Sequence, residues 1–162
     1  MGYEICTSLH VREDELQMIY GKEDYQKIFD KDIECANESI IVSSLGLNQK
    51  NINNYLKLFQ SKLRENVSIT ILTLDPTTYP QNMIEKTDRL IQSLTKNAIN
   101  VITSSSLYKY YAIIDKEIVW YGHMNLLSNI KVHDHMMRIQ NHQLIYELLK
   151  ETKNKIKEEH EQ

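Results

Sequence analysis

Phenol, imidazole and amide side chains that could take part in catalysis or binding gather in one stretch of the chain. They are Tyr108, Tyr110, His123 and Asn125, with the carboxylate of Asp115 between the two pairs. An imidazole can serve as nucleophile or general acid near neutral pH, whereas a phenol with a pKa near ~10 needs strong activation before it attacks. An amide can hydrogen-bond phosphate oxygens without reacting.

Two β-rich runs must position these side chains. The runs cover Tyr110 to Ile114 and Ile118 to Tyr121, and they meet at the polar sequence Asp115-Lys116-Glu117. This spacing predicts a β-hairpin with a short turn. The second run stops at Gly122, so the polar cluster after it begins where a strand gives way to a loop. Such positions are where rigid sheets present functional side chains.

The hairpin resembles the signature of the phospholipase D superfamily. In that signature a His, any residue, a Lys, four residues and an Asp are followed, after the next strand, by Gly-Ser-x-Asn. Asp115, Gly122 and Asn125 match the pattern. Tyr108 stands in the His position, Tyr110 in the Lys position, and His123 replaces the Ser. The chain is similar to a single-motif domain of this family whose reactive positions have been exchanged.

Within the superfamily, the chain most resembles the phospholipase D-like module attached to some bacterial helicases. The likeness covers about Tyr25 to Leu149 and is carried by Leu72-Thr73-Leu74-Asp75-Pro76, Val119-Trp120-Tyr121-Gly122 and Asn125-Leu126-Leu127-Ser128. It implies an α/β fold, a phospholipase D-like sandwich in which helices cover both faces of a mixed β-sheet. It also implies a partner such as a helicase or another nucleic-acid-processing protein.

The hydrophobic periodicity predicts the same architecture independently, because helical and strand patterns alternate for most of the length. The predicted strands and helices divide the chain into an N-terminal arm (1–21), a phospholipase D-like domain (22–152) and a charged C-terminal tail that frays (153–162). A helix between two apolar runs, 39–44 and 67–74, predicts a βαβ unit with parallel strands. The expected helices begin after Lys22, after a cap at Asn48, at about Gln81 and at Gln143, and further short strands are expected at 101–103 and 136–139.

The resemblance implies that catalysis is lost. In the family, one His attacks the phosphodiester, a second His protonates the leaving group, and a Lys and an Asn steady the phosphate oxygens. Tyr108 cannot easily replace the nucleophile, and Tyr110 lacks the positive charge that would offset developing negative charge. We therefore expect no catalytic residue among Tyr108, Tyr110, Asp115, His123 and Asn125, and we expect Asp115 to serve the turn. The alternative is an active phosphodiesterase or nuclease that uses Tyr108 or His123.

A pocket that has lost its chemistry can still bind. Aromatic rings stack on bases and cations contact phosphates, so single-stranded or deformed nucleic acid is the expected ligand, either DNA or RNA. The residues expected to bind it are Tyr108, Lys109, Tyr110, His123, Asn125, Lys131 and Arg138. The histidines at 123, 133 and 135 could ligate a metal, but their spacing fixes no ligand pair. We expect neither a metal nor a cofactor.

Bulk properties set the remaining expectations. The net charge of -3 argues against a protein that coats nucleic acid over its whole surface. Cys6 and Cys35 fit no metal or redox spacing, and no apolar run reaches the ~20 residues of a membrane span, so a cytoplasmic protein is expected. A single motif also implies a homodimer with two-fold symmetry. A protein-binding scaffold without nucleic-acid contact remains a third hypothesis.

Overall fold

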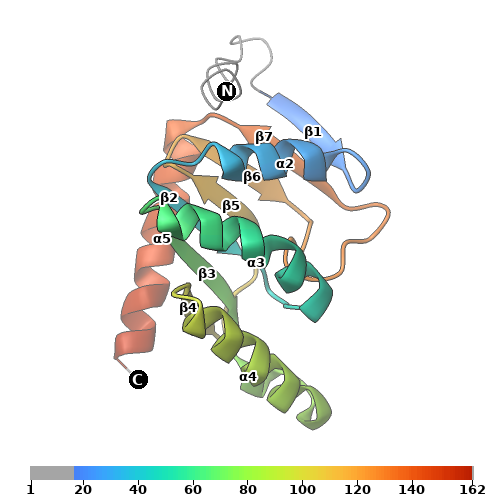
Figure 1. The fold of residues 1–162 in the computed structure, drawn as a ribbon, viewed down its shortest axis with the longest axis vertical. Helices are drawn as coiled ribbons and strands as arrows, with labels where there is room; N and C mark the ends of the chain where they lie inside the picture. Colours follow the sequence, from blue (N-terminus) through green and yellow to red (C-terminus); the bar gives the residue numbers. More distant parts are fainter. Residues whose placement is uncertain (1–16, 162) are drawn as a thin grey trace.

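A seven-stranded mixed sheet forms the centre of the molecule (Figure 1). The computed structural model describes residues 17–161. The strand order across the sheet is β1-β7-β6-β5-β2-β3-β4. The strands are β1 (Gln17–Gly21), β2 (Ser39–Ser43), β3 (Ser68–Leu74), β4 (Asn100–Ser104), β5 (Tyr110–Ile114), β6 (Ile118–Gly122) and β7 (His135–Ile139). The neighbours β2, β3 and β4 are parallel, and the other pairs are antiparallel.

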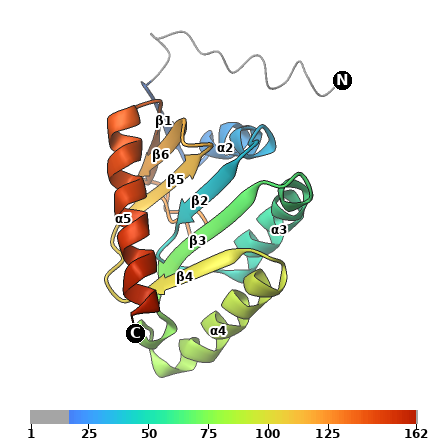
Figure 2. The same cartoon turned by 90° about the vertical axis from the view of Figure 1, so that its left-hand side faces the viewer.

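Helices cover both faces of this sheet, as the sequence predicted. Seen edge-on in Figure 2, α5 lies on one face, and α2, α3 and α4 lie on the other. The helices are α2 (Tyr25–Glu34), α3 (Gln49–Arg64), α4 (Gln81–Lys96) and α5 (His142–His160), with a 3₁₀ turn, η2, at Pro76–Thr78. The predicted βαβ unit is confirmed, because α3 connects the parallel strands β2 and β3.

The larger core lies under α2 and α3. Apolar residues at helical spacing give each helix one buried stripe. Phe29 and Ile33 of α2 are fully buried, as are Ile52 and Phe59 of α3 to within one per cent. The predicted cap is also confirmed, because the side chain of Asn48 accepts a hydrogen bond from the first turn of α3.

A second core lies between the sheet and α5. Tyr111 and Val119 are buried against Ile145 and Leu148 of the helix. The Tyr111 hydroxyl and Thr152 Oγ1 lie 2.8 Å apart within this layer, so the phenol buried here has a polar partner. Burial raises the pKa of Tyr111 to about 12. Successive residues of β5 thus face opposite layers, which leaves Tyr110 on the α3 side.

The predicted hairpin is present, and Asp115 holds its turn. Asp115 and Lys116 both adopt positive φ, 54° and 58°, which the short turn requires. The Asp115 carboxylate accepts hydrogen bonds from the backbone N–H groups of Asn37, Glu38 and Ser39 at 2.8 to 3.1 Å. Asp115 therefore fastens the turn to the loop between α2 and β2.

Two boundaries differ from those expected from the sequence. Residues 17–21, assigned to the arm, form β1 and pair with β7 at the sheet edge. Residues 153–160, assigned to a fraying tail, continue α5, because Ile156 packs against the core residues of β3 and β4. The rest of the expected arm, with Cys6, lies outside the described residues. Over the described range, no helix is both long enough and apolar enough to cross a membrane.

Candidate functional site

Four of the residues predicted to bind nucleic acid line one hollow of about 350 Å³. Tyr108, Lys109 and Tyr110 enter it from the beginning of β5, and His123 enters it from the loop after β6. The other lining residues are Ile19, Tyr121, Gly122, His135 and Met137. The sheet brings these segments together because Tyr110 pairs with Gly122 and Gly122 pairs with Met136.

Asn125 does not line this hollow, and the end of β2 holds its side chain in place. Its Oδ1 accepts hydrogen bonds from Ser44 Oγ at 2.5 Å and from the Gly46 N–H at 3.2 Å. The same Ser44 oxygen accepts from the Leu127 N–H at 3.0 Å, so both sides of the Asn125 loop are fixed to one buried hydroxyl. No acceptor within residues 17–161 takes a hydrogen bond from Asn125 Nδ2. That amide nitrogen is the group left to donate to a phosphate oxygen.

Tyr110 lies on the strand beside Ser44, the residue that holds this amide. Ser43 pairs with Tyr111 across β2 and β5, so Ser44 lies at the level of Tyr110 on the neighbouring strand, about 5 Å away between backbones. Tyr79 closes the same region, because its hydroxyl donates to the Leu45 carbonyl at 2.7 Å. Burial and the neighbouring Tyr110 raise the pKa of Tyr79 above its ordinary value. Tyr110 and Asn125 therefore share one end of the sheet.

Gly122 is required for this packing. A Cβ at Gly122 would collide with the backbone carbonyl oxygen of His135 and would lie 3.0 Å from Met136 Cα. The close approach lets the His123 N–H donate to the His135 carbonyl at 2.9 Å. His123 and His135 are thereby brought to the same wall of the hollow, although the sequence separates them.

The cation nearest the phenols is already paired. Lys109 Nζ lies 2.6 Å from Glu151 Oε2 of α5 and 5.4 Å from the centre of the exposed Tyr108 ring. The hydrogen bond to Glu151 raises the pKa of Lys109 above its ordinary value, with burial acting against it. The charge of Lys109 is largely balanced within the protein, so it contributes little free positive charge to the hollow.

The hollow lacks the arrangement that would activate a nucleophile. Activation of a phenol requires a base within hydrogen-bond reach, and the base in turn needs a group that orients it. Between residues 17 and 161, the Tyr108 and Tyr110 hydroxyls have no hydrogen-bonded base, and the exposed His123 ring has no orienting carboxylate. As it stands, the site can stack a ring and donate hydrogen bonds.

Arg138, predicted to bind nucleic acid, lies in the core and does not line the hollow. Arg138 is buried, and its guanidinium forms two hydrogen bonds with Asp32, at 2.7 Å from Nε and 2.8 Å from Nη2. Trp120 Nε1 donates to the same carboxylate at 2.8 Å. Burial acts to lower the pKa of Arg138, but the hydrogen bonds and charge of Asp32 outweigh it and raise that pKa. Arg138 forms a buried ion pair with Asp32 that is part of the core.

Lys131 and His133 lie apart from the hollow. Both are exposed in the loop between β6 and β7, and neither lines the hollow. In that loop the Lys131 backbone N–H donates to Asp134 Oδ2 at 2.7 Å. His135 is the one residue of this segment that reaches the hollow. Within the described part of the chain, no three His, Cys, Asp or Glu side chains gather in a way that could hold a metal ion.

Comparison with solved structures identifies the architecture. The phospholipase D family member Nuc from Salmonella typhimurium superposes with a TM-score of 0.67 at 13% identity, covering 87% of this chain and 93% of that one. NucT from Helicobacter pylori gives 0.64 at 15% identity, with 87% and 95% covered. The fold is that of the phospholipase D structures. No family model matches the sequence, and no curated protein matches it either.

Larger proteins contain the same phospholipase D fold. TrmBL2, described as an archaeal chromatin protein with a novel mode of DNA binding, matches with a TM-score of 0.59 at 17% identity over 96% of this chain and 57% of its own. Phosphatidylserine synthase from Haemophilus influenzae gives 0.57 at 8% identity over 88% and 38%. At these identities the likeness concerns the fold alone.

The motif positions assigned from the sequence are divided between the two ends of β5. Tyr110 begins the strand and Asp115 follows its other end, about 16 Å away at the usual rise per residue. Sequence reasoning missed Ser44 and Tyr79, which hold Asn125 and frame Tyr110. Ser44 had a weak signal, since it is a polar residue directly after an apolar strand, whereas nothing local indicated Tyr79.

Proposed function

We propose that this protein is a catalytically inactive phospholipase D-like domain that binds nucleic acid as an accessory module. The observation that carries the proposal is the state of Asn125. Its Oδ1 is held by Ser44 and Gly46, and no acceptor among residues 17–161 takes a hydrogen bond from its Nδ2, at the end of the sheet where Tyr110 also lies. This supports a site that still presents an amide donor to phosphate. Phenols, Tyr108 and Tyr110, stand where the family has the His that attacks phosphorus and the Lys that neutralises the developing negative charge.

The chemistry of the hollow favours nucleic acid as the ligand. Tyr108 is two-thirds exposed, so its ring is available to stack on an unpaired base. The Asn125 amide and the His123 ring can donate to phosphate oxygens close by. DNA binding described for TrmBL2, which has the same fold, supports this choice of ligand class.

Retention and cleavage must be measured together to test the proposal. Pure protein is incubated with labelled single- and double-stranded DNA and RNA, with and without Mg²⁺. We expect retention of single strands without products. Asn125→Ala and Tyr110→Ala should each weaken retention, Tyr110→Ala by about 1–3 kcal/mol if its ring stacks on a base. Tyr108→Phe is the matched control, because it keeps the ring and removes only the hydroxyl.

An active phosphodiesterase is the competing proposal. It would have Tyr108 attack the phosphorus atom while His123 takes its proton, and the P–O bond to the departing strand would break as that proton passes to the leaving oxygen, so Tyr108→Phe and His123→Ala would abolish products. Product formation that these two substitutions remove would overturn the inactive assignment. One observation supports this candidate: the exposed imidazole of His123 and the side chain of Tyr108 line the same hollow.

A homodimer is the assembly that we propose for this domain. Ile19 and Met137 are large apolar side chains at the β1–β7 side of the hollow, exposed by 68 and 39%. A second copy seated there would bury them and bring two hollows together about a two-fold axis. Light scattering after size-exclusion chromatography tests this proposal. Ile19→Lys should yield monomers if the apolar rim forms the contact.

The setting of the domain is proposed on the likeness to helicase-attached modules. A helicase or another nucleic-acid-processing protein would be the partner, in the cytoplasm. The scaffold hypothesis predicts the reverse pattern in the incubation above: neither retention nor products, with a stable protein complex instead. Affinity purification from the native cell, with and without nuclease treatment, distinguishes direct protein contact from tethering through nucleic acid.

A further inference from the structure

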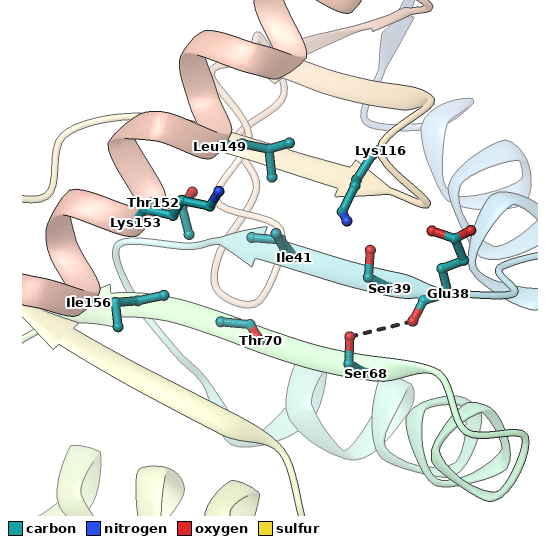
Figure 3. Close-up of a pocket in the computed structure, with 10 residues that line it drawn as sticks. All are labelled: Glu38, Ser39, Ile41, Ser68, Thr70, Lys116, Leu149, Thr152, Lys153 and Ile156. Carbon is teal, nitrogen blue, oxygen red and sulfur yellow. Dashed lines mark hydrogen bonds between the residues drawn. The ribbon is translucent and has the colours of Figure 1, made fainter.

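A second hollow, of about 330 Å³, lies between α5 and the sheet (Figure 3). Its floor combines apolar side chains of β2 and α5 with hydroxyls of β2 and β3. It adjoins the turn of the β5–β6 hairpin, at the end of the sheet remote from Tyr110. The lining residues are Glu38, Ser39, Ile41, Ser68, Thr70, Lys116, Leu149, Thr152, Lys153 and Ile156.

Acidic and basic residues lie on different sides of α5, the helix that forms one wall of this hollow. At 100° per residue, two exposed stripes run along α5 roughly 100° apart. One stripe is acidic and carries Glu147, Glu151 and Glu158, of which Glu151 pairs with Lys109 at 2.6 Å and Glu158 with Lys155 at 3.2 Å. The other stripe is basic and consists of Lys150, Lys153 and Lys157. None of these three forms an ion pair with any residue between 17 and 161.

The opposite wall adds a fourth lysine. Figure 3 shows Lys116 extending from the hairpin turn over β2, across from the side chains of α5. Lys116 also has no ion pair among residues 17–161, and Glu38 is the one acidic residue that lines the hollow. Ser39 Oγ faces the hollow from below and is buried without a hydrogen-bond partner in the described structure. A buried hydroxyl without a partner is costly unless a ligand or water supplies one.

We propose that a single strand of nucleic acid lies along the basic stripe of α5 and places one base in this hollow. The inference rests on the proposed function and adds a second contact surface to it. Successive lysines are separated by about 4.5 and about 6 Å along the helix axis, so each can meet its own phosphate. Ile41, Leu149 and Ile156 offer an apolar floor to the base, and Ser39 and Thr70 offer hydroxyls to its polar edge.

The salt dependence of binding is the decisive measurement. The fluorescence anisotropy of a dye-labelled oligothymidylate of 12 nucleotides gives the Kd at several salt concentrations. It is measured for the full chain and for the triple variant K150Q/K153Q/K157Q. Loss of three phosphate contacts should lower the slope of log K against log salt by about 2. K116N removes the fourth charge with a residue that tolerates positive φ, and it should lower the slope by about 0.7.

A matched control separates local contact from bulk charge. K27Q/K57Q/K86Q removes the same charge from exposed lysines of α2, α3 and α4, on the other face of the sheet. We expect the control to change the slope by less than a third as much. Equal effects from both triple variants would overturn the inference, and so would displacement of the oligonucleotide by polyglutamate as effective as by unlabelled oligonucleotide.

Variants of the first hollow distinguish this inference from the proposed function. If Tyr110→Ala weakens binding and K150Q/K153Q/K157Q does not, the second surface is wrong and the proposed function stands. If only the lysine variant weakens binding, the second surface stands and the motif hollow is not the binding site. Absence of binding by the unaltered protein overturns both. Thermal unfolding of each variant, expected within a few degrees of the parent, verifies the fold.

Discussion

Removal of the Asp32 carboxylate should be among the most damaging single changes to this protein. Its side chain is fully buried and accepts hydrogen bonds from Arg138 Nε, Arg138 Nη2 and Trp120 Nε1, at 2.7 to 2.8 Å. Asp32→Ala leaves a buried guanidinium without a counter-charge and an indole N–H without an acceptor. Breaking a buried ion pair in this way costs about 3–5 kcal/mol, and an orphaned donor adds about 1–3.

The two costs overlap, so we expect a loss of about 4–6 kcal/mol in the free energy of unfolding. A single domain commonly has about 5–15 kcal/mol in total. Urea denaturation measures the change, and Trp120 reports it directly because it is the single tryptophan of the chain and is fully buried. Its emission shifts to the red on unfolding. An unchanged urea m-value would show that the variant still unfolds in two states.

The double variant Asp32→Ala/Arg138→Met provides the control. It removes both charges and keeps an apolar side chain of similar length, so it should be about 2 kcal/mol more stable than Asp32→Ala alone. It should also bind oligonucleotide like the parent, because Arg138 does not reach the surface. A loss below ~1 kcal/mol for Asp32→Ala, or a double variant no more stable than the single, would refute this account of Arg138.

Three further predictions concern the hairpin, the strand edge and α2. Asp115→Ala should lower the free energy of unfolding by about 3 kcal/mol, because it loses the backbone hydrogen bonds and strains positive φ; Asp115→Asn should lose less, as urea titration can show. Gly122→Ala should cost about 1–3 kcal/mol and shift the amide resonances of His135, because a Cβ collides with its carbonyl. Burial raises the pKa of Asp30 above 3.8. Its stabilising contribution is therefore complete below that value and lost as pH rises through the folded pKa, a dependence that Asp30→Asn should remove from unfolding curves.

The local features of this fold could be predicted from the sequence. The hairpin, the cap at Asn48 and the βαβ unit are set by contacts between neighbouring residues or by a short apolar period, and both are visible in the sequence. The edge strand β1 was missed because its five residues carry no decisive pattern, and only pairing with β7 specifies them. The last two turns of α5 were missed for a similar reason. Ile156 stabilises them by packing against core residues of β3 and β4, and that contact exists only in the folded protein.

The sequence by itself determined which chemical groups the site could contain, because side-chain chemistry does not depend on folding. Phenols at 108 and 110 are weak nucleophiles at neutral pH and carry no positive charge. Only the tertiary structure decided which charges are available to a ligand. Lys109 and Arg138 both looked free, yet one is paired with Glu151 and the other with Asp32, distant in the chain. A cation's partner is chosen by proximity in space, and proximity in space is what the fold creates.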